Sequence, residues 1–171
     1  PFSYVQHNRI PQDEVRQVYE GMEIATHGFR HEPLGAVSED EMRASVDADK
    51  TALEKIFGTT VVGHAYAQGS TSPAVQAYLK AQGYQYARAV FPSGGFAFPE
   101  NPMNFRPSSS LILKNAMKLV ERFKCEEPGE KDLLLFLWAH SYEMDYDKGN
   151  ASWYALERLF ESIAGRNDIV Y

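Results

Sequence analysis

The fold class is decided by one stretch of the sequence, TTVVGHAYAQGSTSPAVQAYLKAQGYQYARAV (Thr59–Val90). Its first eight residues are rich in apolar and β-branched side chains, as in a buried strand. Pro73 and Gly83 then bracket a helix, and residues 84–90 repeat the strand pattern. A strand, a helix and a second strand in succession indicate a parallel pair joined by a right-handed crossover. This stretch therefore predicts an α/β protein.

The same alternation extends in both directions from this stretch. Upstream, Ser38 and Glu41 have the spacing of a capping box, which opens a helix that Gly58 ends. Downstream, a loop rich in Pro, Gly and Ser (91–110) precedes a further helix, strand and helix. Outside Thr59–Val90 we expect strands at 1–5, 22–26, 133–139 and 168–171, and helices at 11–21, 38–57, 111–123 and 152–165.

The expected strands are nearly continuous apolar runs, which are typical of a parallel sheet covered on both faces. Such a sheet is either a barrel or an open, doubly wound sheet. No glycine-rich phosphate-binding motif follows any expected strand, which weakens the nucleotide-binding form of the open sheet. We therefore expect an irregular (β/α) barrel of parallel strands in a single domain, 1–171.

Composition limits the classes of partner. The formal net charge is −6, and the sequence has no Lys/Arg-rich stripe that would neutralise phosphates, so nucleic acid is not expected. Cys125 is the only cysteine, which rules out an intrachain disulfide. The longest apolar run, Leu133–Ala139, is far shorter than the roughly 20 residues of a bilayer span. We expect no membrane span, and the compartment, cytoplasmic or exported, stays open.

All five histidines fall at or just beyond the end of an expected strand, and none falls in an expected helix. In a (β/α) barrel the active site lies at the carboxyl ends of the strands, so this placement favours a site there. His27 and His31 are four positions apart, and two imidazoles at this spacing can bind one metal ion. Taken alone, such a pair is more often formed by ordinary surface or capping residues. The others are His7, His64 and His140.

A second polar cluster follows a buried strand in LWAHSYEMD (137–145). His140 can act as a proton donor, because histidine titrates near neutral pH. A carboxylate beside it can orient the ring, and aromatic side chains can form a wall for a sugar ring. The alternative is a solvated loop. The candidates for these two roles are Glu143 or Asp145, and Trp138 with Tyr142.

Four motifs in this order resemble those of the polysaccharide deacetylases, which are carbohydrate esterase family 4 with its NodB-homology domain. EIATHGFRH (23–31) resembles the second motif of that family, and VVGHAYAQG (61–69) resembles its third. GYQYARAV (83–90) is similar to a following strand, and LWAHSYEMD to the late motif whose histidine acts near the leaving group. The resemblance spans the chain from Phe2 to Tyr171.

The resemblance implies a metal-dependent hydrolase that removes N- or O-acetyl groups from a carbohydrate. His27 and His31 would bind a divalent ion, with zinc expected first and cobalt, nickel or manganese as alternatives. His140 would deliver a proton to the leaving group, and Glu143 or Asp145 would orient it. The acetylated carbohydrate is the implied partner. Its expected contacts are Tyr66, Arg88, Trp138 and Tyr142.

The sequence departs from the family's pattern in two places. The first motif, Thr-Phe-Asp-Asp-Gly, supplies an acidic ligand and the catalytic base, and this chain contains no Asp-Asp pair. Because PFSYV (1–5) resembles the strand after that motif, we expect the motif upstream of Pro1 and a barrel incomplete at its N-terminus. Glu23 and Asp145 are the only substitutes that we can propose for the missing carboxylates. In the third motif, Ala65, Ala67 and Gln68 stand where Arg, Pro and Tyr are common.

These departures keep two further readings open. One is a carbohydrate-binding barrel that has lost catalysis. The other is a different metal-dependent barrel hydrolase, which would be favoured by two bound ions rather than one.

Overall fold

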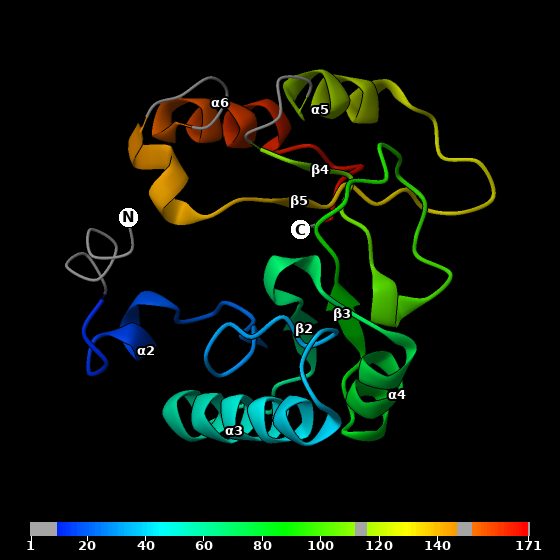
Figure 1. Ribbon diagram of the computed structural model, residues 1–171. Coiled ribbons are helices and arrows are strands. Elements are labelled where there is room, and N and C mark those ends of the chain that lie inside the picture. Colours follow the sequence, from blue (N-terminus) through cyan, green and yellow to red (C-terminus); the bar gives the residue numbers. More distant parts are fainter. Residues whose placement is uncertain (1–9, 112–115, 147–151, 171) are drawn as a thin grey trace. The chain divides into compact units, whose positions relative to one another are not determined.

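A computed structural model of the chain shows two compact units, Pro1–Ala87 and Arg88–Tyr171 (Figure 1). Within both units helices and short parallel strands make a mixed α/β fold, as the alternating pattern predicts. No helix in the described part of the chain is long and apolar enough to cross a membrane. The structure describes residues 10–111, 116–146 and 152–170.

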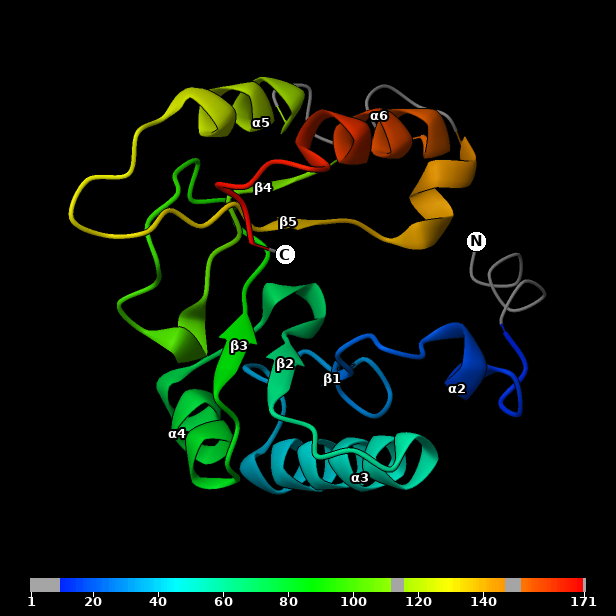
Figure 2. The same cartoon turned by 180° about the vertical axis from the view of Figure 1, so that it is seen from behind.

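The first unit is built on a three-stranded sheet in the order β1-β2-β3. β1 (Ala25–Thr26) and β2 (Gly63–Ala65) are parallel, with Ala25 opposite Gly63 and Thr26 opposite His64. The arrows of β2 and β3 (Tyr86–Arg88) point the same way in Figure 2. This sheet confirms the strand, helix, strand order expected from Thr59–Val90.

Two helices connect these strands. α3 (Glu39–Phe57) packs against β1 and against α4 (Pro73–Ala81). The predicted capping box is present, because the Ser38 hydroxyl accepts from the Glu41 N–H and the Glu41 carboxylate accepts from the Ser38 N–H. Gly58 ends α3 at φ +71°, a left-handed conformation that glycine adopts without steric cost.

The core of the first unit lies where these helices meet the sheet. Tyr86 crosses the sheet over Gly63, and a Cβ on Gly63 would overlap the Tyr86 ring. The Tyr86 hydroxyl then donates a hydrogen bond of 2.7 Å to Glu23. A larger residue at position 63 would therefore force the Tyr86 side chain to shift. The largest fully buried side chains of the unit include Leu34, Val46, Val61, Tyr66 and Leu79.

The second unit is built on one parallel pair of strands. β4 (Ser109–Ser110) and β5 (Leu137–Trp138) place Ser110 opposite Trp138. α5 packs against β4 and against α6, which begins after Ser152, whose hydroxyl accepts from the Ala155 N–H. A 3-10 helix, η3 (Ser141–Tyr146), follows β5. The bounds of the helices are Ala116–Cys125 for α5 and Trp153–Ile163 for α6.

Several expected elements are shorter than their sequence patterns. The helix expected at 11–21 is reduced to α2 (Val15–Val18), none of whose residues is buried, so no tertiary packing extends it. The strand expected at 168–171 is wrong for its described part, where Asp168 pairs with Arg166 in a turn and Val170 is exposed. The strand expected at 1–5 lies outside the described residues.

Candidate functional site

The loop after β1 brings the two histidines of the H-x-x-x-H pair together. The ring centroids of His27 and His31 are 4.9 Å apart, and the rings meet edge to face at 76°. His31 adopts φ +63°, and its N–H donates to the carbonyl of Gly28 at 3.0 Å. This turn folds the loop back on itself, so that both imidazoles lie on the same short segment.

The ring of His27 is held by a neighbouring strand. Its Nδ1 lies 2.6 Å from the carbonyl oxygen of Ala65, the last residue of β2. A carbonyl oxygen only accepts hydrogen bonds, so Nδ1 must carry the proton and Nε2 the lone pair. A histidine fixed in this way by a carbonyl is the arrangement that metal-ligating imidazoles commonly show.

The backbone of the same loop is held by polar side chains on α3 and just before it. Four successive N–H groups, at residues 27–30, all donate to them. Asp49 accepts from the first two, with a distance of 2.8 Å from the His27 nitrogen. Ser45 accepts from the third at 3.0 Å, and Glu32 accepts from the fourth at 2.8 Å. The Ser45 hydroxyl in turn donates to Glu32 at 2.8 Å, which closes the cluster.

The pKa values of the two carboxylates in this cluster, Asp49 and Glu32, are shifted in opposite directions. Burial raises the pKa of Asp49, and the hydrogen bonds from the loop backbone only partly oppose this effect. Burial also raises the pKa of Glu32, but hydrogen bonds from Arg30, its own N–H and Ser45 outweigh it and lower the pKa overall. Sequence reasoning did not identify Asp49 or Glu32. Ser45 and Asp49 are four apart on α3, which is the signal that they share one helix face.

His64 lies in β2, late in its apolar run as expected, but its side chain is buried in the core and does not face a site at the strand end. It is 1% exposed, and its Nδ1 is 2.8 Å from the Thr26 hydroxyl. Thr26 also donates to Tyr84 at 3.1 Å, and the rings of Tyr66 and Tyr84 flank His64. Alternation along β2 turns His64 into the core, where these contacts fix the register of β1 against β2.

Tyr66 is also a core residue. Its side chain is 0% exposed, and burial raises its pKa to about 12. The expected contact of Tyr66 with a sugar therefore stays a prediction that its burial disfavours.

In the second unit, side chains around the end of β5 form a cluster of stacked rings and charges. The guanidinium of Arg88 lies 4.6 Å over the Trp138 ring, and Trp138 meets His140 edge to face at 5.4 Å. Tyr142 stacks on His140 with centroids 5.0 Å apart. The carboxylate of Glu143 lies 3.1 Å from His140 Nδ1 and accepts from the His140 backbone N–H at 2.8 Å. The structure thus brings these five predicted residues together.

A comparison with known families gives a match that falls within the first unit. Residues 3–87 match the family model for polysaccharide deacetylase. This part of the chain belongs to the polysaccharide deacetylase family. No curated protein sequence matches the chain.

Three solved structures share the fold of this chain at 16–19% identity. They cover 96–98% of the chain, which spans only 30–64% of their lengths. The allantoinase Puue has a TM-score of 0.65 and 17% identity, and the match covers 96% of this chain and 59% of that one. A protein from Mycobacterium smegmatis assigned to the polysaccharide deacetylases has a TM-score of 0.56 and 16% identity, and the match covers 96% of this chain and 64% of that one. A 4-alpha-glucanotransferase from Thermococcus litoralis has a TM-score of 0.58 and 19% identity, and the match covers 98% of this chain and 30% of that one.

The two acids proposed as substitutes for the missing carboxylates form hydrogen bonds elsewhere. Glu23 accepts from Tyr86, and Asp145 accepts from the indole N–H of Trp153 at 2.7 Å. Of the two acids expected to orient His140, Glu143 is therefore the one that touches it. Among the described residues no three His, Cys, Asp or Glu side chains converge to hold a metal ion. The third ligand stays a prediction, and so does a common mouth for His27 and His140, which belong to different units.

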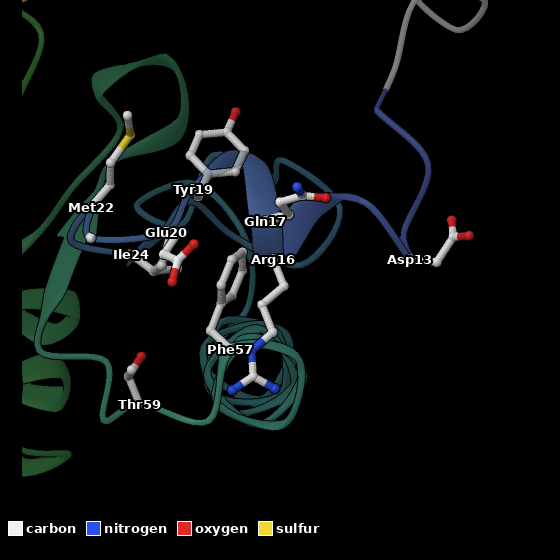
Figure 3. Close-up of a pocket in the computed structure, with 10 residues that line it drawn as sticks. Asp13, Arg16, Gln17, Tyr19, Glu20, Met22, Ile24, Phe57 and Thr59 are labelled. Atoms are coloured by element: carbon white, nitrogen blue, oxygen red, sulfur yellow. The ribbon is translucent and has the colours of Figure 1, made fainter.

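A cleft of about 520 Å³ lies at the other ends of the strands in the first unit (Figure 3). Met22 and Ile24 precede β1 and Thr59 precedes β2, whereas His27 follows β1. Phe57, at the end of α3, also lines this cleft. Its lining contains no histidine, so the His27–His31 pair and this cleft are separate features.

Proposed function

We propose that this chain belongs to the catalytic part of a metal-dependent hydrolase that removes N- or O-acetyl groups from a carbohydrate. The observation that carries the proposal is the His27–His31 pair, on a loop held by α3 within the segment that matches the polysaccharide deacetylases. Hydrolysis of an acetyl group needs a nucleophilic water, a polarised carbonyl and a proton for the leaving group.

The architecture that we propose is an irregular (β/α) barrel. The parallel pairs β1–β2 and β4–β5 support it, and so do the helices between β1 and β2, between β2 and β3, and between β4 and β5. In such a barrel the active site lies at the carboxyl ends of the strands.

The cofactor that we propose is a divalent ion held by His27 and His31, zinc first, with cobalt, nickel or manganese as alternatives. When bound, such an ion acidifies a water molecule and polarises the acetyl carbonyl. His27 fits this role, because its Nδ1 proton faces Ala65 and its lone pair is on Nε2. Asp49 and Ala65 fix its backbone and its ring respectively.

His140 is the general acid in this proposal. Glu143 lies 3.1 Å from its Nδ1 and orients the ring, and the proton on Nε2 goes to the sugar nitrogen or oxygen that leaves. Arg88, Trp138 and Tyr142 would contact the sugar. The proton of the attacking water needs a carboxylate, which we assign to the family's first motif, absent from this sequence.

The test measures zinc content and acetate release with the full-length protein. We expect about one zinc ion per chain, and acetate release from an acetylated polysaccharide that His27→Ala abolishes together with zinc binding. A His27→Ala protein that keeps both would refute the proposal.

The inactive carbohydrate-binding barrel stays a second candidate, because Ala65, Ala67 and Gln68 replace the common residues of the third motif. It predicts that the polysaccharide is bound without any release of acetate. Two zinc ions per chain would instead favour the other barrel hydrolase.

A further inference from the structure

Two buried polar atoms at the end of the β4–β5 pair have no hydrogen-bond partner among the described residues. They are the hydroxyl oxygen of Ser110 and the indole nitrogen of Trp138. Ser110 is only 5% exposed. An unpaired buried polar group lowers stability, so such a group in a native protein calls for an explanation.

The two atoms belong to neighbouring positions. Ser110 and Trp138 are register partners in the parallel pair β4–β5, and partners at the same register project their side chains from the same face of a sheet. Two unpaired hydrogen-bonding groups therefore lie side by side, and one of them, the indole N–H, can only donate.

The two buried serines just before Ser110 are paired. Ser108 accepts from the Phe136 N–H at 3.0 Å and donates to the Leu134 carbonyl at 3.3 Å. Ser109 donates to the Ser110 carbonyl at 3.0 Å. The missing partner of Ser110 is thus specific to that position and is not a general property of the strand.

The pair adjoins the residues proposed for catalysis. Trp138 touches His140, the proposed acid, and the guanidinium of Arg88 covers a face of its indole ring. Because Arg88 covers that face, the ring edge that carries the N–H is the part of Trp138 that matters for binding. This changes its expected role from a stacking wall to a hydrogen-bond donor.

We propose that the Ser110 hydroxyl and the Trp138 indole N–H together bind one oxygen atom of the acetylated sugar. Both groups donate, so the oxygen must accept, as a sugar hydroxyl or an acetyl carbonyl does. The inference rests on the proposed function and names a substrate contact of the same site. Sites that hydrogen-bond a substrate oxygen discriminate strongly, because the protein groups stay unpaired when that oxygen is missing.

The experiment compares Ser110→Ala, Trp138→Phe and Ser108→Ala in the whole natural protein. The probe is a tetramer of N-acetylglucosamine, with its Kd measured by calorimetry and the Tm of each variant measured without probe. Ser110→Ala and Trp138→Phe should each weaken binding about tenfold, which is the loss of one hydrogen bond. Ser110→Ala should leave the Tm unchanged or raised, because its hydroxyl forms no hydrogen bond with the part of the chain that the structure describes.

Ser108→Ala is the matched control, since it lies on the same face of the strand two positions earlier. It should lower the Tm, because the Phe136 N–H loses its acceptor, and leave the Kd unchanged. A Ser110→Ala protein that loses as much Tm as this control, or binds the tetramer as tightly as the wild type, would overturn the inference. A wild-type protein that neither binds the tetramer nor releases acetate from it overturns the proposed function instead, and the Tm comparison still decides whether Ser110 is unpaired.

Discussion

The loop that carries His27 and the end of the β4–β5 pair satisfy their polar groups in opposite ways. In the first unit, four successive N–H groups at 27–30 all find acceptors on Asp49, Ser45 or Glu32. In the second unit, Ser110 and Trp138 keep buried polar atoms without partners in the described residues. The hydrogen bonds of the first unit fix the geometry of the loop before any ligand binds. The polar atoms of Ser110 and Trp138 in the second unit stay available to bind a ligand.

The largest expected effect separates chemistry from metal binding. His140→Gln keeps a polar side chain of similar size but removes the proton donor, so acetate release should fall by about 10²–10⁴-fold. Zinc affinity should not change, because His140 is not a proposed ligand. Equal losses of acetate release and of zinc affinity would show that the two units do not have separate roles.

Asp49→Ala removes the acceptor for two of the four loop N–H groups. We expect zinc to bind about 10–100-fold more weakly, as when other groups that orient metal ligands are lost. Asp49→Asn should recover part of the affinity, since its amide oxygen still accepts. The measurement is a zinc titration against a competing chelator.

Asp47→Ala is the control for Asp49→Ala. Asp47 is on the same helix and its carboxylate accepts from the Tyr78 hydroxyl at 2.8 Å, away from the loop. If both variants weaken zinc binding equally, the effect comes from α3 as a whole and not from the clamp on His27.

Gly63→Ala tests the sheet beneath the loop. The added methyl group overlaps the Tyr86 ring, and overpacking of this kind typically lowers the free energy of unfolding by about 1–3 kcal/mol. Urea denaturation would measure the loss. Adding Tyr86→Ala should remove the overlap, so the double variant should lose less than the sum of the two single changes.

The smallest expected effect concerns the start of α3, which carries Ser45 and Asp49. The hydrogen bonds of the capping box lower the pKa of Glu41 below its ordinary 4.5. A lowered pKa means that the stabilisation is complete above pH 4.5 and is lost as the pH falls through the lowered pKa. Between pH 6 and pH 3 the Tm of the wild type should therefore fall slightly more than that of Glu41→Gln, whose amide keeps the cap without titrating.

The sequence predicted those parts of the fold that depend on residues close to one another in the chain, such as helix ends. Ser38, Glu41 and Gly58 gave the bounds of α3, and Pro73 gave the start of α4. The spacing of His27 and His31 predicted that the two rings would lie together, and their centroids are 4.9 Å apart. Each of these features depends on residues close in sequence, whose geometry a helix or turn dictates.

The rest depended on contacts between distant residues. Asp49 lies 22 positions after His27, and only the packing of α3 against β1 makes them neighbours. The position of His64 late in its strand did not show which way its side chain points, because only the pairing of β1 with β2 turns it into the core. The partnerless hydroxyl of Ser110 has no sequence signal, because its paired neighbour Ser108 is the same residue type.

The contacts that shape the His27 loop have a consequence for protein engineering. Every acceptor of the four loop N–H groups comes from residues 32–49, which follow the loop directly in the chain. The Ala65 carbonyl is the one contact described above that comes from further away. The segment from Ala25 to Gly58 therefore contains all the side chains that hold the N–H groups of this turn. Grafting it beside a strand that offers a carbonyl would place the same pair of imidazoles in another scaffold.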